Sequence, residues 1–258
     1  VKNNHRTLIC SDLKNENGIY TIDFEDFEKK IIEHNVKLFI LCSPHNPAGR
    51  VWKKEELKRL FEICKKHHVF VVSDEIHQDL VFGENKHIPS LSIGDHDDMM
   101  VSIAAASKTF NIAGAQNSMV IIPDKKLRKK WDAYTKGNRI QGGNTFGYVA
   151  AQAAYAGGKE WLDQVLKQID ENYRYLKAEL AEKMPEAIVT PLEGTYLCWI
   201  NLKAYVSADD IKEVIQKKCH LAVDYGDWFG GERFGTFIRM NLATSMENVK
   251  TGVEALIN

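Results

Sequence analysis

Residues 37–74 read KLFILCSPHNPAGRVWKKEELKRLFEICKKHHVFVVSD, and this stretch decides the fold class. It holds two short, mostly apolar runs, KLFILC at 37–42 and VFVVS at 69–73, which are typical of strands buried on both faces. Between them, residues 53–68 place apolar side chains at helical spacing and lysines on the opposite side. A strand, an amphipathic helix and a second strand in this order predict a crossover unit of a parallel sheet.

The same pattern extends through the first half of the chain. Residues 99–104 and 118–122 predict two further strands of the sheet. A helix is expected at about 24–34, where Asp23 is a candidate cap and Asp26 stands at the capping-box position. The first half therefore reads as α/β with a mainly parallel sheet.

After the pair Gly157–Gly158, apolar residues recur at helical spacing over about 161–183 and predict one long helix. The second half then changes in texture. Strands are expected at 195–201 and 236–242, a helix begun by Ser207 with Asp210 is expected to run to about 218, and a last helix is expected at 246–257. We predict an α/β large domain over 1–160, a connecting helix over 161–184 and a smaller α+β C-terminal domain over 185–258.

Composition excludes several classes of function. The 258 residues carry 34 Lys and Arg against 35 Asp and Glu, so no global basic field favours nucleic acid as a partner. No apolar run approaches the roughly 18 residues of a membrane helix, so no membrane partner is expected. The five cysteines are odd in number and widely spaced without a C-x-x-C pair, which favours reduced thiols in the cytoplasm over disulfides or a zinc site. No metal ligand set is predicted.

Three polar clusters each follow an expected strand: residues 43–50 around Asn46, residues 74–77 beginning with Asp74, and residues 107–111 around Lys108. Taken singly, each has an ordinary structural interpretation as a turn, a helix cap or a solvated lysine. Ligands of open α/β sheets, however, bind outside the carboxyl ends of the strands. An amide, a carboxylate and a lysine at successive strand ends therefore predict a site.

The chemistry of the three side chains fits pyridoxal 5'-phosphate. This cofactor needs a lysine that forms an imine with it, and a carboxylate that keeps its ring nitrogen protonated. It also needs a hydrogen-bond donor to its phenolic oxygen. Lys108, Asp74 and Asn46 supply these three groups in that order.

The motifs SPHNPAGRVW, VVSDEIHQDLVF, ASKTFNIAGAQNS, GTYLCWIN and FIRMNLATS also carry a family resemblance. In this order they resemble the motifs of fold-type I pyridoxal-phosphate enzymes, the class I/II aminotransferase superfamily, and within it most of all the cystathionine β-lyase or C–S lyase branch. The resemblance covers essentially the whole chain but only about the later two-thirds of the family. It implies a pyridoxal-phosphate-transferase-like large domain that is incomplete at its N-terminus, and we expect the chain to be a piece of a larger enzyme.

The resemblance implies a role for each matching residue. Lys108 is the catalytic lysine that binds the cofactor and moves the α-proton of the substrate. Asp74 pairs with the pyridine nitrogen, and Asn46 bonds the phenolic oxygen. His77 stands where many aminotransferases have a tyrosine on that oxygen, which favours the lyase branch. Arg239 clamps the substrate α-carboxylate as a bidentate fork, against the alternative of a surface salt bridge.

Two positions depart from the broader pattern of the superfamily. Ala105 replaces a serine three residues before the lysine, and Gln116 replaces an arginine eight residues after it. Both positions usually serve the cofactor phosphate. Phosphate binding is therefore expected to rest on Ser107, Gln116 and groups outside this chain.

The expected reaction is β-elimination from cystathionine or a related cysteine S-conjugate, which gives a thiol, pyruvate and ammonia. An aminotransferase with the same residues is the first alternative, and a non-catalytic fragment or protein-binding relative is the second. The joint presence of Asn46, Asp74, Lys108 and Arg239 argues against a decayed site. The resemblance also implies a small amino-acid substrate and a homodimer, with residues 142–147 as a candidate contact.

Overall fold

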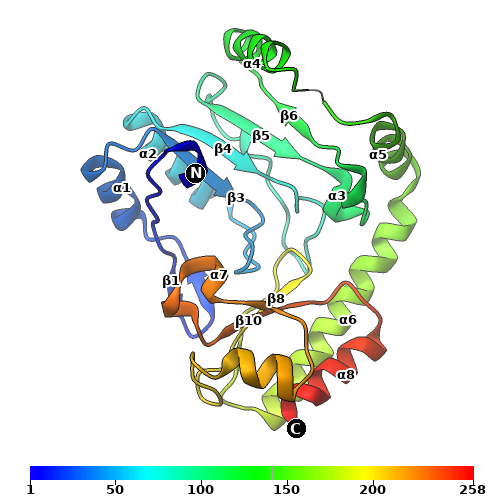
Figure 1. Ribbon diagram of the computed structural model, residues 1–258. Helices are drawn as coiled ribbons and strands as arrows, with labels where there is room; N and C mark the ends of the chain where they lie inside the picture. The colour runs from blue at the N-terminus through cyan, green and yellow to red at the C-terminus, as the bar shows by residue number, and fades with distance from the viewer. Residues whose placement is uncertain (141) are drawn as a thin grey trace.

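The computed structural model describes residues 1–140 and 142–258. Figure 1 shows the two four-stranded sheets, one above the other in that view, with a long helix running down one side of the molecule. The upper sheet has the order β3-β4-β5-β6 and the lower sheet the order β7-β8-β10-β9. The architecture is α/β, as the sequence predicts.

The upper sheet is mainly parallel. β3, β4 and β5 run parallel to one another, while β6 is antiparallel to β5. The register pairs Cys42 with Asp74 and Asp74 with Ile103, so the three parallel strands end side by side. The helix between β3 and β4 confirms the predicted crossover. The strands of the upper sheet are β3 (Leu38–Cys42), β4 (Phe70–Asp74), β5 (Met100–Ala104) and β6 (Met119–Ile121), and the crossover helix is α2 (Lys54–Lys66).

One expectation about this sheet is wrong. β3 is not buried on both faces, because Leu38 and Ile40 are 50% and 55% exposed. Alternate side chains of a strand point to opposite faces, and here only the face of Phe39 and Leu41 joins the core that includes α2 and α1 (Phe24–Glu33). The continuous apolar run therefore did not distinguish one packed face from two.

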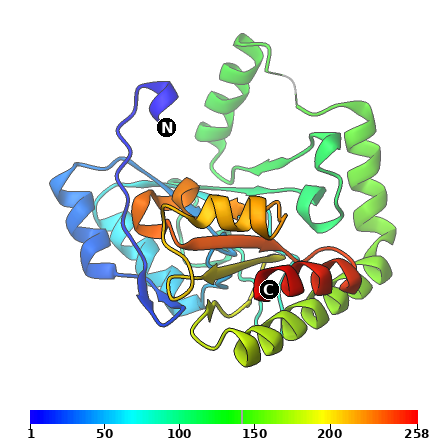
Figure 2. The ribbon, with the colours of Figure 1, turned by 60° about the horizontal axis from the view of Figure 1, so that its bottom comes forward.

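The lower sheet is antiparallel and packs on two helices. Figure 2 shows α6 (Lys159–Lys183) and α8 (Met246–Ile257) side by side below its strands. Their apolar faces meet the sheet in one core that includes Leu176, Ile200 and Ile238, all fully buried. Its strands are β7 (Ile188–Val189), β8 (Leu197–Asn201), β9 (Asp224–Tyr225) and β10 (Phe237–Asn241).

The helix expected from Ser207 differs from the prediction. The Ser207 hydroxyl accepts the backbone N–H of Asp210 at 3.2 Å and donates to its carboxylate at 2.7 Å, so the cap is present. The segment that follows becomes a π-helix over Glu213–Lys218 instead of a regular α-helix. The sequence pattern does not distinguish these two windings, because both present Ile211 and Ile215 to the core.

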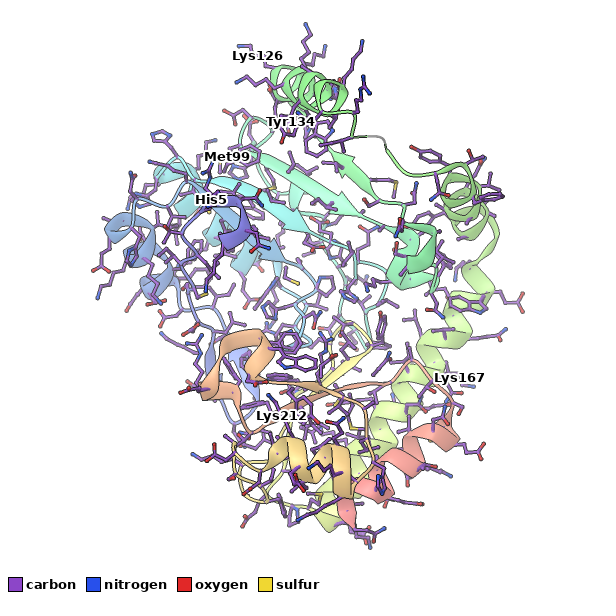
Figure 3. The ribbon with its side chains drawn as sticks, in the orientation of Figure 1. His5, Met99, Lys126, Tyr134, Lys167 and Lys212 are labelled. Carbon is purple, nitrogen blue, oxygen red and sulfur yellow. The ribbon has the colours of Figure 1, made fainter. Side chains whose placement is uncertain are left out.

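The short strands β7 and β9 were not predicted, and several other elements were not predicted either. They are the hairpin of β1 (Lys14–Glu16) and β2 (Ile19–Thr21), and the helices α3 (Ala106–Thr109), α4 (Lys125–Gly137), α5 (Thr145–Gly157) and α7 (Asp227–Gly230). Lys126 and Tyr134 on α4 lie at the top of the molecule in Figure 3. Across residues 1–140 and 142–258, every helix is too short or too polar to cross a bilayer.

We expect Leu176→Ala to lower the free energy of unfolding by about 2–5 kcal/mol, because it leaves a cavity in the core beneath the lower sheet. Urea unfolding followed by circular dichroism measures this loss. The matched control is Lys167→Ala on the same helix (Figure 3), whose side chain is 78% exposed and whose loss should cost less than about 0.5 kcal/mol. Equal losses in the two variants would contradict the described packing.

Candidate active site

The three polar clusters predicted from the sequence meet at the carboxyl end of the upper sheet. Backbone hydrogen bonds continue beyond the strands, from Ser43 N–H to the carbonyl of Asp74 at 2.9 Å and from Glu75 N–H to the carbonyl of Ile103 at 2.8 Å. Lys108 lies in α3, which follows β5 at the same end (Figure 1). The strand ends therefore bring together the loop of Asn46, Asp74 and Lys108.

Asp74 ends β4 in a half-buried position. Burial raises the pKa of its carboxyl above the ordinary value, and the charge of Glu75 raises it further. The backbone N–H of Ile76, 3.3 Å from Oδ1, and the charge of Lys108 act in the opposite direction. A carboxylate in such surroundings gains stability from any additional cation placed against it.

His77 is buried, with 3% of its surface exposed. Burial lowers the pKa of its imidazole to about 4, and the charges of Lys108 and Arg239 contribute in the same direction. Its ring meets that of Tyr196 edge to face, with centroids 5.7 Å apart. Nδ1 has no hydrogen-bond partner among the described residues. At neutral pH this side chain is therefore an uncharged ring with a buried nitrogen that no described residue bonds.

Lys108 is half-buried, and no hydrogen bond or ion pair holds its ammonium group among the described residues. With Thr109 and Asn111 it lines a cavity of about 350 Å³ whose other walls come from α6 and from residues 241–245. The amine is therefore available to a ligand in that space. The other lining residues include Leu80 and Tyr196, Trp161, Val165 and Gln168 of α6, and Asn241 at the end of β10.

Arg239 lies on β10 of the lower sheet and reaches the upper one. Its Nη1 donates to Oδ1 of Asn46 at 2.6 Å. Nε donates to Oδ2 of Asp224 at 3.1 Å, and Nη2 donates to the same oxygen. The Phe229 ring lies 4.5 Å from the guanidinium carbon. With 15% of its side chain exposed, Arg239 is not a surface residue, although it does form an ion pair.

Ser107 and Gln116 are less closely tied to this group. The Ser107 hydroxyl donates to the carbonyl of Asn117 at 3.3 Å. Gln116 is exposed and has a left-handed backbone with φ of 47°. The hydrogen bonds among the described residues do not join either side chain to Asp74 or Lys108, so their role toward a phosphate stays a prediction.

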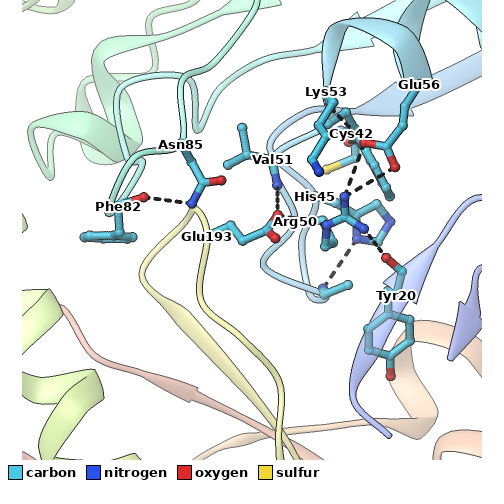
Figure 4. Close-up of polar contacts among 12 residues, drawn as sticks. Tyr20, Cys42, His45, Arg50, Val51, Lys53, Glu56, Phe82, Asn85 and Glu193 are labelled. Carbon is cyan, nitrogen blue, oxygen red and sulfur yellow. Dashed lines mark hydrogen bonds and ion pairs between the residues drawn. The ribbon is translucent and has the colours of Figure 1, made fainter. Parts of the chain in front are cut away.

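A buried ion-pair network fixes the loop that carries Asn46 (Figure 4). Arg50 donates through Nε to Glu193 at 2.8 Å, and its Nη2 lies 3.2 Å from Glu56. Glu193 also accepts the backbone N–H of Val51 at 2.9 Å. The carbonyl of Gly49 accepts the backbone N–H of Glu193 at 2.9 Å. The loop after β3 is thus anchored to the segment that precedes β8.

Sequence reasoning missed three contributors to this site. Tyr196 lies within the quoted motif GTYLCWIN, so its position was visible but its contact with His77 was not. No sequence pattern pointed to Asp224 or Glu193 as site residues, because each pairs with an arginine that is distant in sequence or lies in another strand. Acidic residues outside a motif are ordinarily interpreted as solvated surface.

Comparison with known proteins agrees with the geometry. A family model described as aminotransferase class I and II matches residues 5–256. The chain is 39% identical over 258 residues to cystathionine beta-lyase PatB of Bacillus subtilis, covering 99% of this chain and 66% of the relative. It is 30% identical to protein MalY of Escherichia coli, again covering 66% of that relative.

Solved structures give the same result. A pyridoxal-phosphate-bound putative aminotransferase from Clostridium difficile superimposes with a TM-score of 0.95 at 40% identity, over 100% of this chain and 66% of that one. Cystalysin from Treponema denticola, which contains pyridoxal 5'-phosphate, superimposes with a TM-score of 0.93 at 36% identity, over 99% and 65%. The chain therefore spans about 66% of the length of these relatives.

Because the folded chain keeps His77 neutral down to about pH 4, whereas an ordinary histidine binds a proton near 6.5, its burial destabilises the folded chain as the pH falls between these values. We expect His77→Asn to make the decline in unfolding free energy shallower over pH 6.5–4, by at most about 1.4 kcal/mol per pH unit. Urea titrations at several pH values measure the slope. The exposed His34→Asn is the control, and an unchanged slope in His77→Asn would contradict the assignment.

Proposed function

The chain belongs to the class I and II aminotransferase family, and from this premise we propose that it is a pyridoxal-phosphate-dependent C–S lyase. Its substrate is cystathionine or a related cysteine S-conjugate, from which it releases a thiol, pyruvate and ammonia. The observation that carries the proposal is the convergence of Lys108, whose amine bonds no other described residue, with the carboxylate of Asp74 and the Asn46–Arg239 pair at one sheet end. The relatives with lyase names favour a lyase over an aminotransferase, and so do His77 and Gln116, which stand where many aminotransferases have a tyrosine and an arginine.

The residues present fit pyridoxal 5'-phosphate. Bound there, the cofactor supplies an electron sink for negative charge that develops at the substrate α-carbon. Asp74, whose buried carboxylate gains from a facing cation, would hold a proton on the pyridine nitrogen. His77, whose buried Nδ1 has no partner among the described residues, is close enough to Lys108 and Arg239 for their charges to lower its pKa, and it is proposed to contact the cofactor.

Asn46 is oriented for its proposed role by Arg239. Because Oδ1 accepts the arginine N–H at 2.6 Å, the Nδ2 amide hydrogens face other partners. A side-chain amide fixed in this way can donate to the phenolic oxygen of the cofactor. Ser107 and Gln116 are proposed for the phosphate, together with groups outside this chain.

Lys108 is the proposed catalytic base. Its amine takes the proton from the substrate α-carbon, which leaves an electron pair there, and the thiolate then departs from the β-carbon. Arg239 holds the α-carboxylate of the substrate by charge-assisted hydrogen bonds. The cavity that Lys108 lines offers space for the substrate beside this amine.

We propose a homodimer in the cytoplasm, with residues 142–147 at the contact between subunits. Support for the contact comes from large apolar side chains in and beside this segment, namely Phe146, Tyr148 and Val149, all of which are exposed in the single chain.

The division into residues 1–160, 161–184 and 185–258 also stays a proposal. The reduced cysteines fit the proposed compartment.

Titration with pyridoxal 5'-phosphate should produce a visible absorption band that is absent from Lys108→Ala, because only the wild-type chain has the lysine amine in the site. The exposed Lys126→Ala (Figure 3) is the control and should keep the band. Pyruvate released from L-cystathionine is then assayed on the loaded chain. Amino transfer to a keto acid without pyruvate would instead assign an aminotransferase, and a band without turnover would favour a non-catalytic relative.

Asp74→Asn should lower kcat by at least about 10²-fold, because it removes the charge opposite the pyridine nitrogen and preserves the shape of the side chain. Circular dichroism and cofactor titration confirm that the variant is folded and loaded. Asp132→Asn, an exposed aspartate of α4, should leave kcat unchanged. A folded, loaded Asp74→Asn with wild-type kcat would remove Asp74 from the proposed mechanism.

A further inference from the structure

The guanidinium of Arg239 is held from several directions before any substrate arrives. A guanidinium has five N–H groups. The N–H on Nε and one N–H on Nη2 donate to Oδ2 of Asp224, and one N–H on Nη1 donates to Oδ1 of Asn46. Phe229 lies against its π-face at 4.5 Å. Among the described residues, one N–H on Nη1 and one on Nη2 have no partner. These two groups are on the two terminal nitrogens, which a carboxylate can contact together.

We propose that Asp224 is a positioning residue for substrate binding, which fixes Arg239 so that its terminal nitrogens face the substrate α-carboxylate. The inference rests on the proposed function of the site. It assigns to Asp224 no contact with the substrate and no part in the proton transfer. Its action is through the orientation of the Arg239 side chain.

The strand register supports this role. Asp224 of β9 and Arg239 of β10 are directly paired across the antiparallel ladder, so the ion pair is built into the sheet. The next residue, Tyr225, is buried opposite Ile238, which fixes the short strand in place. Gly226 then donates its N–H to the carbonyl of Phe237 at 2.8 Å. A carboxylate on so restrained a backbone is a better orienting group than one on a free loop.

Burial explains why Arg239 needs such a partner. The arginine side chain is 15% exposed, whereas that of Asp224 is 39% exposed. A nearly buried cation without an anionic partner is costly and turns toward whichever acceptor it can reach. Within the site, the acceptor beside it is Asn46. Without Asp224 we expect the Arg239 guanidinium to turn, so that its two free N–H groups no longer face the substrate.

Asp224 has two effects that oppose each other. Its acceptor oxygen orients the guanidinium, which favours substrate binding, while its negative charge repels an incoming carboxylate. Asn at this position keeps an acceptor oxygen and removes the charge, whereas Ala removes both. Comparing the two variants therefore separates orientation from charge.

The experiment measures kcat and KM for pyruvate release from L-cystathionine with the loaded wild type, Asp224→Ala and Asp224→Asn. We expect Asp224→Ala to raise KM at least about tenfold with kcat within about threefold of wild type. This is the effect of losing one of the charge-assisted hydrogen bonds from Arg239 to the substrate carboxylate. Asp224→Asn should restore KM to within about threefold of wild type. Asp12→Ala, which removes an exposed pair with Arg233, is the control.

A second measurement does not depend on catalysis. In ¹⁵N-arginine-labelled chain, the Nε–H resonance of Arg239, assigned by its loss in Arg239→Lys, should exchange with solvent at least about tenfold faster in Asp224→Ala than in wild type. Unchanged exchange, an unchanged or lower KM in Asp224→Ala, or an Asn variant as impaired as Ala overturns the proposal. A wild type that releases no pyruvate defeats the proposed function, and the exchange measurement then decides the positioning of Arg239 alone.

Discussion

The guanidinium of Arg50 is buried, with 7% of the residue exposed, between the loop after β3 and the segment before β8. A buried cation is tolerated only when it is paired, and Glu193 and Glu56 supply that pairing from either side. Because Glu193 also takes the backbone N–H of Val51, a single carboxylate fixes both a side chain and a backbone. Removing Glu193 would leave Arg50 paired with Glu56 alone and would also take the acceptor from the backbone N–H of Val51.

The geometry of the site follows from this junction. Two residues after Glu193, the backbone N–H of Thr195 donates to the carbonyl of Leu80. The next residue, Tyr196, packs its ring against His77. The loop before Arg50 carries Asn46, which meets Arg239 of the lower sheet. Residues from both sheets thus converge because the segments that carry them are tied together a few residues away.

The sequence predicted the parts of this arrangement that depend on local pattern. Apolar runs located β3, β4 and β5, and because parallel strands end at one edge, Asp74 and Lys108 could be placed together in advance. The exposure of Leu38 and Ile40 could not be predicted from the sequence, because the burial of a strand depends on what covers it and not on its own composition. The π-helix at Glu213–Lys218 was likewise invisible, because its apolar residues reach the core in either winding.

The remaining features of the site depend on contacts between segments that are distant in sequence. Asn46 and Arg239 are 193 residues apart, and Arg50 and Glu193 are 143 apart, so no spacing rule links them. Motif resemblance could nominate Asn46 and Arg239 separately but not the hydrogen bond between them. That bond has a chemical consequence, because it orients one amide end toward the arginine and leaves the other to act as a donor. The two sheets therefore do more than enclose the site: the lower one sets the orientation of a donor that belongs to the upper one.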